Sequence, residues 1–344
     1  MRIINIISGS SNGGAEKFFE RFCIALSKKK KINQIVIYRK NSVREELFKK
    51  YSMKTVQLSF FNNWDFFTKR RIKKTLDAFQ PNIIFTWMNR ASLMLPKNVS
   101  RQIFIGRLGG YYKLKNYINC DYLVANTKGI KEYILKQGWD PKKVIHLPNF
   151  VNENTNHKIY KNFNIYKNTT IILGVGRFHE NKGFDILIKS LISNKDCILW
   201  LVGEGSLRKY YIELAKKVGV FKRLTIFSWT NNISKFYNSA DILVCSSRIE
   251  PLGNIILEGW AHKIPVISSN IMGPNELITH NLNGLKFEKE KVSDLSKCIN
   301  FLKKNSELKK KLSKNGFQEY KNNFSERIVM NKFLTFFNSF CIGY

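Results

Sequence analysis

The chain has 344 residues, the length of about two ordinary domains. Hydrophobic residues make up 44% of it and charged residues 24%, so the composition is that of a globular protein and excludes a disordered one. No apolar run reaches the length of a transmembrane helix. The six cysteines are scattered without a C-x-x-C pair, which argues against a disulfide framework or a zinc site and favours the reducing cytoplasm.

The charge is strongly basic, with 58 Lys and Arg against 25 Asp and Glu, a net charge of +33. Such an excess is compatible with binding to nucleic acid, to an anionic membrane or to a polyanionic substrate. Coding bias is an equally good explanation, because the lysines are spread along a chain that is also crowded with Asn and Ile. No nucleic-acid-binding module is visible, so the sequence predicts no nucleic-acid partner.

Short apolar runs alternate with longer amphipathic stretches from the beginning of the chain. The runs predicted as buried strands in the first half are Ile3–Ser8, Gln34–Tyr38, Thr55–Leu58, Asn82–Trp87, Gln102–Gly106, Tyr122–Ala125 and Val144–Leu147. The helices expected between them include Ala15–Ser27, Asp65–Phe79 and Lys128–Gln137. This alternation predicts βαβ units and a doubly wound parallel sheet.

The alternation lapses around residues 148–168, where Pro148 and many Asn indicate a linker, and then it resumes. The later predicted strands are Thr170–Gly174, Cys197–Val202, Leu224–Phe227, Asp241–Cys245, Pro265–Ser268 and Leu285–Phe287. The later predicted helices are Phe184–Ile192, Ser206–Val218, Asn254–His262 and Val292–Lys303. The α/β chain therefore reads as two Rossmann-like domains, and ligands are expected beyond the carboxyl ends of their strands, in a cleft where the sheets face one another.

Two glycine-rich clusters follow the first strand of each half. SGSSNGGAE, at Ser8–Glu16, would let a ligand approach the backbone at a helix start, although a tight turn explains it equally well. GVGRFHENKG, at Gly174–Gly183, adds Arg177 and Lys182. Two cations on one loop at a strand end suit a diphosphate, with solvated surface charge as the alternative.

Two further clusters follow later strands. LVGEGSLR, at Leu201–Arg208, is explained most simply by a turn. SSRIEPLGNIILEGW, at Ser246–Trp260, places Glu250 ahead of a helix and Glu258 inside it. Helix N–H groups can bind phosphate while carboxylates accept hydrogen bonds from hydroxyls, as a sugar nucleotide requires. Taken singly, each acid could instead be an ordinary residue of the helix cap or of the exposed helix face.

Together with GPNELITHNLNG (Gly273–Gly284), these clusters resemble the C-terminal half of the family 4 glycosyltransferases of the GT-B fold, over roughly residues 170–288. Glu250 and Glu258 match the E-x7-E signature of that family, and Asn12–Glu16 resembles its N-terminal glycine loop. The resemblance implies an acceptor domain at 1–155, a nucleotide-sugar donor domain at 156–325, and a helix at 326–344 that returns to the N-terminal domain.

The resemblance also implies transfer of a sugar from a nucleotide-diphosphate donor to an acceptor hydroxyl, with retention at the anomeric carbon, in lipopolysaccharide or other surface-glycan assembly. By this resemblance, the donor diphosphate is held by Arg177 and Lys182, and Glu250 contacts the transferred sugar. Sugar and phosphate also contact the backbone at Gly253, Asn254 and Ile255. Glu258 binds the ribose, and Gly14 approaches the donor. Leu252 and Gly259 depart from the usual Phe and Ala, which leaves the identity of the donor sugar in doubt.

No D-x-D pair occurs in the chain, so we expect neither a metal nor another cofactor beyond the donor substrate. Preorganised cations and helix termini would then stabilise the leaving diphosphate. The alternatives are a sugar-nucleotide epimerase or a glycan phosphorylase of the same fold, and a basic nucleic-acid-binding protein. A phosphorylase should be longer, and an epimerase should lack the paired motifs.

Two features of the N-terminal half bear on partners and location. GRLGGYYKLKNY, at Gly106–Tyr117, reads either as an acceptor-binding loop or as a polar loop with packing tyrosines.

In the helix expected at Asp65–Phe79, the predicted apolar stripe is Phe67, Ile72, Leu76 and Phe79, and the basic residues beside it are Lys69, Arg70, Lys73 and Lys74. Such a helix could lie on the inner face of the cytoplasmic membrane or could simply be solvated, so we expect a cytoplasmic protein that is peripheral at most.

Overall fold

The computed structural model describes residues 1–9, 13–62, 65–96, 102–153, 169–230 and 232–340. The chain divides into two compact units. The N-terminal unit comprises Met1–Phe150 and Glu326–Tyr344, and the C-terminal unit comprises Val151–Ser325. The boundary expected between residues 155 and 156 lies outside the described residues.

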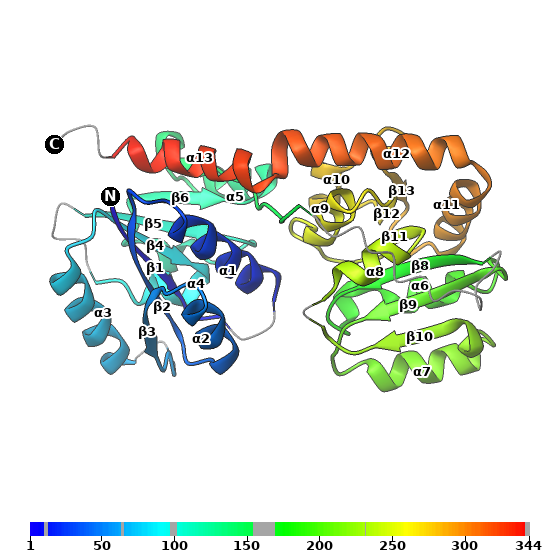
Figure 1. Ribbon diagram of the computed structural model, residues 1–344, viewed down its shortest axis with the longest axis horizontal. Coiled ribbons are helices and arrows are strands. Elements are labelled where there is room, and N and C mark those ends of the chain that lie inside the picture. Colours follow the sequence, from blue (N-terminus) through cyan, green and yellow to red (C-terminus); the bar gives the residue numbers. More distant parts are fainter. Residues whose placement is uncertain (10–12, 63–64, 97–101, 154–168, 231, 341–344) are drawn as a thin grey trace. The chain divides into compact units, whose positions relative to one another are not determined.

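The N-terminal unit is built on a seven-stranded parallel sheet of order β3-β2-β1-β4-β5-β6-β7 (Figure 1). Its strands are β1 (Arg2–Ile7), β2 (Asn33–Arg39), β3 (Lys54–Leu58), β4 (Ile83–Trp87), β5 (Ile103–Leu108), β6 (Tyr122–Ala125) and β7 (Val144–His146). β4 is buried along its whole length, as expected of an apolar run in the middle of a parallel sheet. The order is that of a Rossmann fold, with its switch point between β1 and β4.

Helices cover both faces of this sheet. They are α1 (Gly14–Ser27), α2 (Ser42–Lys49), α3 (Phe66–Phe79), α4 (Met88–Leu93), α5 (Lys128–Lys136) and α13 (Glu326–Asn338). One apolar core contains side chains of α1, α2 and α13, and the other contains those of α3, α4 and α5. The returning helix α13 buries Val329, Met330, Phe333 and Phe337 in the first core, so the last helix belongs to the N-terminal unit, as predicted.

The apolar stripe predicted for α3 is wrong in one position. Ile72, Leu76 and Phe79 are buried, but Phe67 is 79% exposed. Thr68 takes the buried place instead and lies one turn before Ile72 on the same helix face. The stripe of α3 that packs on the sheet therefore starts one residue later than predicted, and Phe67 is left on the outer surface.

The C-terminal unit contains a six-stranded parallel sheet of order β10-β9-β8-β11-β12-β13. Its strands are β8 (Thr170–Val175), β9 (Cys197–Val202), β10 (Leu224–Phe227), β11 (Ile242–Cys245), β12 (Val266–Ser269) and β13 (Leu285–Phe287). Its helices are α6 (Phe184–Ser190), α7 (Arg208–Lys217), α8 (Ser234–Ser239), α9 (Asn254–Ala261), α10 (Met272–Leu277), α11 (Val292–Lys304) and α12 (Ser306–Glu319). This second Rossmann-like order has its switch point between β8 and β11.

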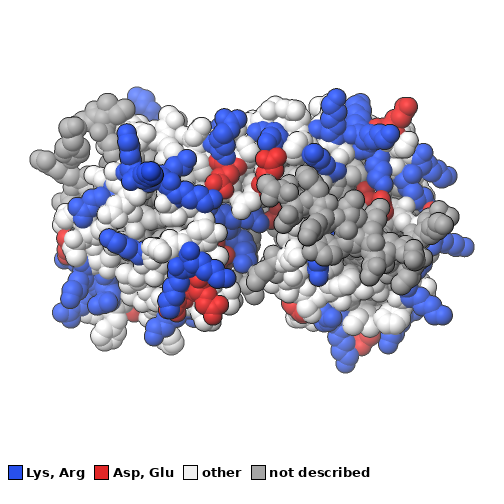
Figure 2. Space-filling model, in the orientation of Figure 1, with Lys and Arg blue, Asp and Glu red and all other residues white. Residues whose placement is uncertain are grey.

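The basic side chains are distributed over both units. On the visible face, Lys and Arg lie over α3 and α12 among other elements, and acids are fewer (Figure 2). Within the described residues, no helix has the length and apolarity needed to cross a membrane.

Candidate active site

The candidate site of the C-terminal unit lies where β8 and β11 end side by side. The two strands pair in parallel, so the loops that follow them leave the same edge of the sheet. The loop after β8 carries Arg177 and Lys182, and the loop after β11 carries Glu250. Because these two strands flank the switch point, their loops diverge and leave room for a ligand between them.

Lys182 and Glu250 meet at this point. The Lys182 ammonium donates a short hydrogen bond to Glu250 Oε2 and forms an ion pair with it, and both side chains are largely buried. The Ser247 hydroxyl donates to the same carboxylate oxygen at 3.5 Å. Burial acts to lower the pKa of Lys182, but the Glu250 carboxylate outweighs it and the net pKa is raised. Lys182 is therefore a cation throughout the physiological pH range.

Arg177 lies on the same loop as Lys182. Its side chain is exposed, whereas Phe178 beside it is fully buried and anchors the loop. The charge of Arg177 acts on Lys182 and opposes the raised pKa of that lysine. Two cations that repel one another beside a carboxylate form a site whose charge an incoming diphosphate would balance.

Glycines bring the loops into direct contact. A Cβ on Gly183, whose φ is +59°, would lie 2.2 Å from the carbonyl oxygen of Ser246. A Cβ on Gly273 would lie 2.2 Å from the carbonyl oxygen of Glu250. Only a residue without a side chain fits at either place, so these contacts fix the backbone on which Lys182 and Glu250 stand.

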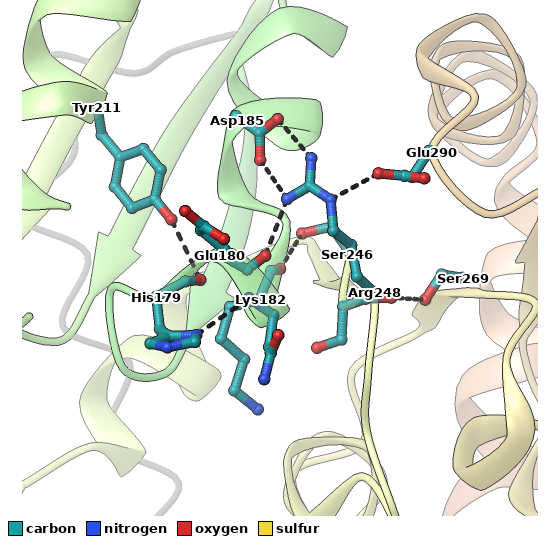
Figure 3. Close-up of polar contacts among 11 residues, drawn as sticks. His179, Glu180, Lys182, Asp185, Tyr211, Ser246, Arg248, Ser269 and Glu290 are labelled. Atoms are coloured by element: carbon teal, nitrogen blue, oxygen red, sulfur yellow. Dashed lines mark hydrogen bonds and ion pairs between the residues drawn. The ribbon is translucent and has the colours of Figure 1, made fainter.

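A cluster of ion pairs and hydrogen bonds centred on Arg248 connects the same loops (Figure 3). Arg248 donates to both carboxylate oxygens of Asp185, at 2.9 and 2.7 Å, and to Glu290 at 2.7 Å. It also donates to the carbonyl oxygen of Glu180 at 2.8 Å. The Lys182 side chain extends away from this cluster (Figure 3). Arg248 therefore joins the loops without forming a contact that would occupy the Lys182 ammonium group.

Helix α9 begins directly after the Glu250 loop. Gly253 precedes it with a left-handed backbone, φ +99°, and the N–H groups of Asn254 and Ile255 belong to its first turn. Such N–H groups have no acceptor within the helix and are suited to an anion. Glu258 lies one turn further along, where its Oε2 accepts a hydrogen bond of 2.9 Å from the Tyr237 hydroxyl.

The remaining predicted site residue, Gly14, is the first residue of α1 and belongs to the N-terminal unit. The structure thus brings Lys182 and Glu250 into contact, places Arg177 close enough to act on Lys182, and puts Gly253, Asn254, Ile255 and Glu258 on the adjoining helix. The sequence motifs predicted no role for Asp185, Arg248 or Glu290. Arg248 stands within the SSRIEP motif, which was the available signal.

A cavity of about 380 Å³ lies elsewhere in the C-terminal unit. It is lined by Asp241 and Pro265, which precede β11 and β12, and by Lys309 of α12. That is the amino edge of the sheet, whereas ligands of doubly wound sheets bind at the carboxyl edge. We therefore place the candidate site at the Lys182–Glu250 pair and not in this cavity.

The comparisons with known proteins agree on a class. Residues 155–319 match the family model described as "Glycosyl transferases group 1". The chain is 28% identical to the lipopolysaccharide core biosynthesis glycosyltransferase LpsD of Rhizobium meliloti over 340 residues, 98% of each chain. Its fold is similar to that of a glycosyltransferase from Rickettsia africae, with a TM-score of 0.87, 22% identity and coverage of 100% and 99% of the two chains. It is also similar to that of Anabaena HepE in complex with UDP and glucose, with a TM-score of 0.82, 15% identity and coverage of 98% and 99%.

The matched segment and the relatives define the class: the protein is a glycosyltransferase. The structural similarity shows that it has the GT-B fold. Residues 155–319 are its group 1 glycosyl transferase segment, and the predicted resemblance is confirmed there. The enzyme class predicted from the four motifs is confirmed as well.

Proposed function

We propose that the protein transfers a sugar from a nucleotide-diphosphate sugar to an acceptor hydroxyl in the assembly of lipopolysaccharide or another surface glycan, with retention and without a metal. The observation that carries the proposal is the Lys182–Glu250 ion pair beside Arg177, at the switch point of the C-terminal sheet. The similarity to LpsD supports the glycan class. The UDP and glucose bound to HepE support a nucleotide-sugar donor.

The described side chains suit the chemistry of a leaving diphosphate. Negative charge develops on the diphosphate as the glycosidic bond to the donor breaks, and preorganised cations lower the energy of that state. Arg177 and Lys182 supply the cations, and the first-turn N–H groups of α9 supply further donors. Retention and metal independence are inferences from the E-x7-E resemblance and from these cations.

The carboxylates of Glu250 and Glu258 would have different roles in donor binding. Glu250 is bonded to Lys182, and we assign it to hydroxyls of the transferred sugar. Glu258 lies on α9 beside the first-turn N–H groups, with its Oε2 bonded to the Tyr237 hydroxyl, and we assign its carboxylate to the ribose hydroxyls. Gly14 would approach the donor from the N-terminal unit, which we propose to be the acceptor domain.

A donor screen tests the proposal. Thermal unfolding of the full chain would be followed with UDP-, GDP- and ADP-sugars while EDTA is present. A donor at 100 times its Kd stabilises the folded state by about 2.7 kcal/mol, so the true donor should raise the Tm clearly. The configuration of the anomeric carbon, read by NMR on the product, tests retention. Stabilisation that appears only after Mg²⁺ or Mn²⁺ is added would overturn metal independence.

We also propose that the protein is cytoplasmic and rests on the inner face of the membrane through α3. Arg70, Lys73 and Lys74 are exposed and Lys69 is half-buried, so the outer side of the helix is cationic. Phe66 and Phe67 extend from the start of the same helix and are 66% and 79% exposed. Cations attract anionic lipid headgroups, and aromatic side chains bury themselves at the interface.

A further inference from the structure

The N-terminal unit contains a polar cavity of about 450 Å³. It lies at the carboxyl edge of the sheet, beside the switch point between β1 and β4. The described residues that line it include Ser8 after β1, Glu16 of α1, Arg39 at the end of β2, Asn89 and Arg90 of α4, and Asn116 after β5. The position is that of a ligand site in a doubly wound fold, in the unit that we propose to be the acceptor domain.

The chain makes an unusual turn to reach this cavity. Met88, the residue after β4, has φ +67°, in the left-handed region that side chains other than glycine rarely adopt. This conformation turns the chain sharply from the end of the strand into α4, so that Asn89 and Arg90 line the cavity. Backbone strain of this kind persists where the surroundings hold it in place, and it clusters at ligand sites.

The polar wall of the cavity is ordered by its own hydrogen bonds. The Asn116 amide donates to Asn89 Oδ1 at 2.5 Å and joins the loop after β5 to α4. The Tyr133 hydroxyl donates to the carbonyl oxygen of Tyr112 at 2.9 Å and fixes the same loop from α5. Tyr112 also lines the cavity. The Asn89 and Asn116 amides, held in this way, are suited to bind the hydroxyls of a sugar.

Two guanidinium groups give the cavity its charge. Arg90 donates to the carbonyl oxygen of Phe60 at 3.2 Å, which steadies the side chain and leaves most of its N–H donors available. Arg39 is exposed at the end of β2. Within the described part of the chain, neither arginine forms an ion pair, although the Glu16 carboxylate lines the same cavity. Paired N–H donors of this kind match the two oxygens of a phosphate or carboxylate.

We propose that this cavity binds the acceptor and that the acceptor is acidic: a phosphate or carboxylate group of the glycan lies against Arg39 and Arg90, and neighbouring hydroxyls bind Asn89 and Asn116. The inference rests on the proposed transferase function and deepens it by naming the acceptor class. The cavity has two guanidinium groups and one carboxylate, that of Glu16, so an acidic group of the glycan would balance the remaining positive charge and a neutral glycan would not. Phosphate and carboxylate share the recognition chemistry, and the test distinguishes them.

The test measures binding of small acidic sugars to the full chain by ligand-observed NMR. The nucleoside diphosphate of the donor found by the thermal screen is kept at saturation so that the cations of the C-terminal unit are occupied. The probes are glucose 6-phosphate, glucuronate, glucose and inorganic phosphate. Glucose 6-phosphate or glucuronate should bind about tenfold more tightly than glucose. Inorganic phosphate should compete with the preferred probe. Equal binding of glucose and both acidic sugars, or no binding of either acidic sugar at millimolar concentration, would overturn the proposal.

Arg39→Gln and Arg90→Gln identify the site. Each should remove most of the preference for the acidic sugar, whereas Arg71→Gln, which removes an exposed cation of α3 outside the cavity, should keep it. A preference retained in both cavity variants contradicts the assignment. Stabilisation by the same nucleoside diphosphate is measured on every variant and should not change. A wild-type protein that binds none of UDP, GDP and ADP would instead refute the donor site, so the two proposals fail separately.

Discussion

The ammonium group of Lys182 and the carboxylate of Glu250 form an ion pair although 68 residues separate them in the chain. The two side chains can meet because β8 and β11 are neighbours in the parallel sheet, so the loops that follow them begin at the same edge. A donor diphosphate that binds there would compete with Glu250 for Lys182. The carboxylate would then be released toward the hydroxyls of the transferred sugar.

Glu250→Ala should lower kcat by about 10² to 10³, because it removes the hydrogen-bond acceptor that we assign to the transferred sugar. Initial rates with the donor found by thermal shift measure the effect. Glu250→Gln serves as the matched control, since it keeps the shape and loses the charge. If the alanine variant turned over like the wild type with an unchanged Tm, Glu250 would have no part in the reaction.

Glu258→Ala should act on donor binding instead of turnover. Loss of two charge-assisted hydrogen bonds to a ribose should raise the Kd of the nucleotide about tenfold, which corresponds to about 1.4 kcal/mol. Isothermal titration with the nucleoside diphosphate measures it. Tyr237→Phe is the control, because it removes the hydroxyl that donates to Glu258 at 2.9 Å and leaves the carboxylate in place. Equal affinity in wild type and Glu258→Ala would remove the ribose assignment.

The sequence was enough to predict both sheets because their strands are short apolar runs. Cys197–Val202 is mostly buried, and even the half-buried edge strand Leu224–Phe227 is apolar enough to be identified. It was also enough to predict that the motifs after β8 and β11 lie together, since parallel strands end at one edge. The short helix α4 was missed. It has six residues, too few for an apolar repeat, and it starts at the left-handed Met88, which no pattern indicates.

Side-chain partners across loops were harder to predict. The bond from Arg248 to Asp185 depends on where two loops cross, and spacing along the chain does not encode this. The stripe of α3 was misplaced for a related reason: Phe67 is more apolar than Thr68, but Thr68 lies on the face that packs. The Thr68 hydroxyl donates to Asp65, which caps the helix, and this bond offsets the burial of a polar group.

The Asp185–Arg248 pair should make stability depend on pH in the acid range. Burial acts to raise the pKa of Asp185, but the hydrogen bonds and charge of Arg248 outweigh it and the net pKa is lowered. A carboxylate with a lowered folded pKa contributes stability above its unfolded pKa of about 4, and loses it as the pH falls through the folded value. Urea unfolding at several pH values below about 6 should show the free energy of unfolding decreasing toward acid.

Asp185→Asn isolates this contribution. The amide cannot titrate, so the free energy of unfolding of the variant should depend less on pH below about 4 and should be lower than that of the wild type at neutral pH. Glu290→Gln is the control: it removes the more exposed partner of Arg248, and its effect should be smaller. Identical pH dependence in wild type and Asp185→Asn would show that the pair does not stabilise the loops.

The outer face of α3 should bind anionic membranes through aromatic as well as basic side chains. Asp65 accepts hydrogen bonds from the N–H groups of Phe61 and Thr68, at 2.9 Å each, and so ties Phe61 to the start of α3. Phe61 is 79% exposed and adds a third exposed aromatic ring to Phe66 and Phe67. The double variant Phe66→Ser and Phe67→Ser should reduce binding to vesicles of phosphatidylglycerol and phosphatidylcholine about tenfold or more, because two large apolar side chains no longer enter the interface. Co-sedimentation measures the bound fraction.

The salt dependence of vesicle binding distinguishes the attraction of the α3 cations to lipid headgroups from the insertion of the phenylalanine side chains. Lys73→Gln with Lys74→Gln should weaken binding at low salt and have less effect at high salt, since headgroup attraction is screened. The phenylalanine variant should be weaker at both salt concentrations. Phe221→Ser, at an exposed aromatic residue of the C-terminal unit, is the matched control and should bind like the wild type. Wild-type binding by both α3 variants, or an equal loss in Phe221→Ser, would contradict a membrane-facing α3 and leave its cations as solvated surface charge.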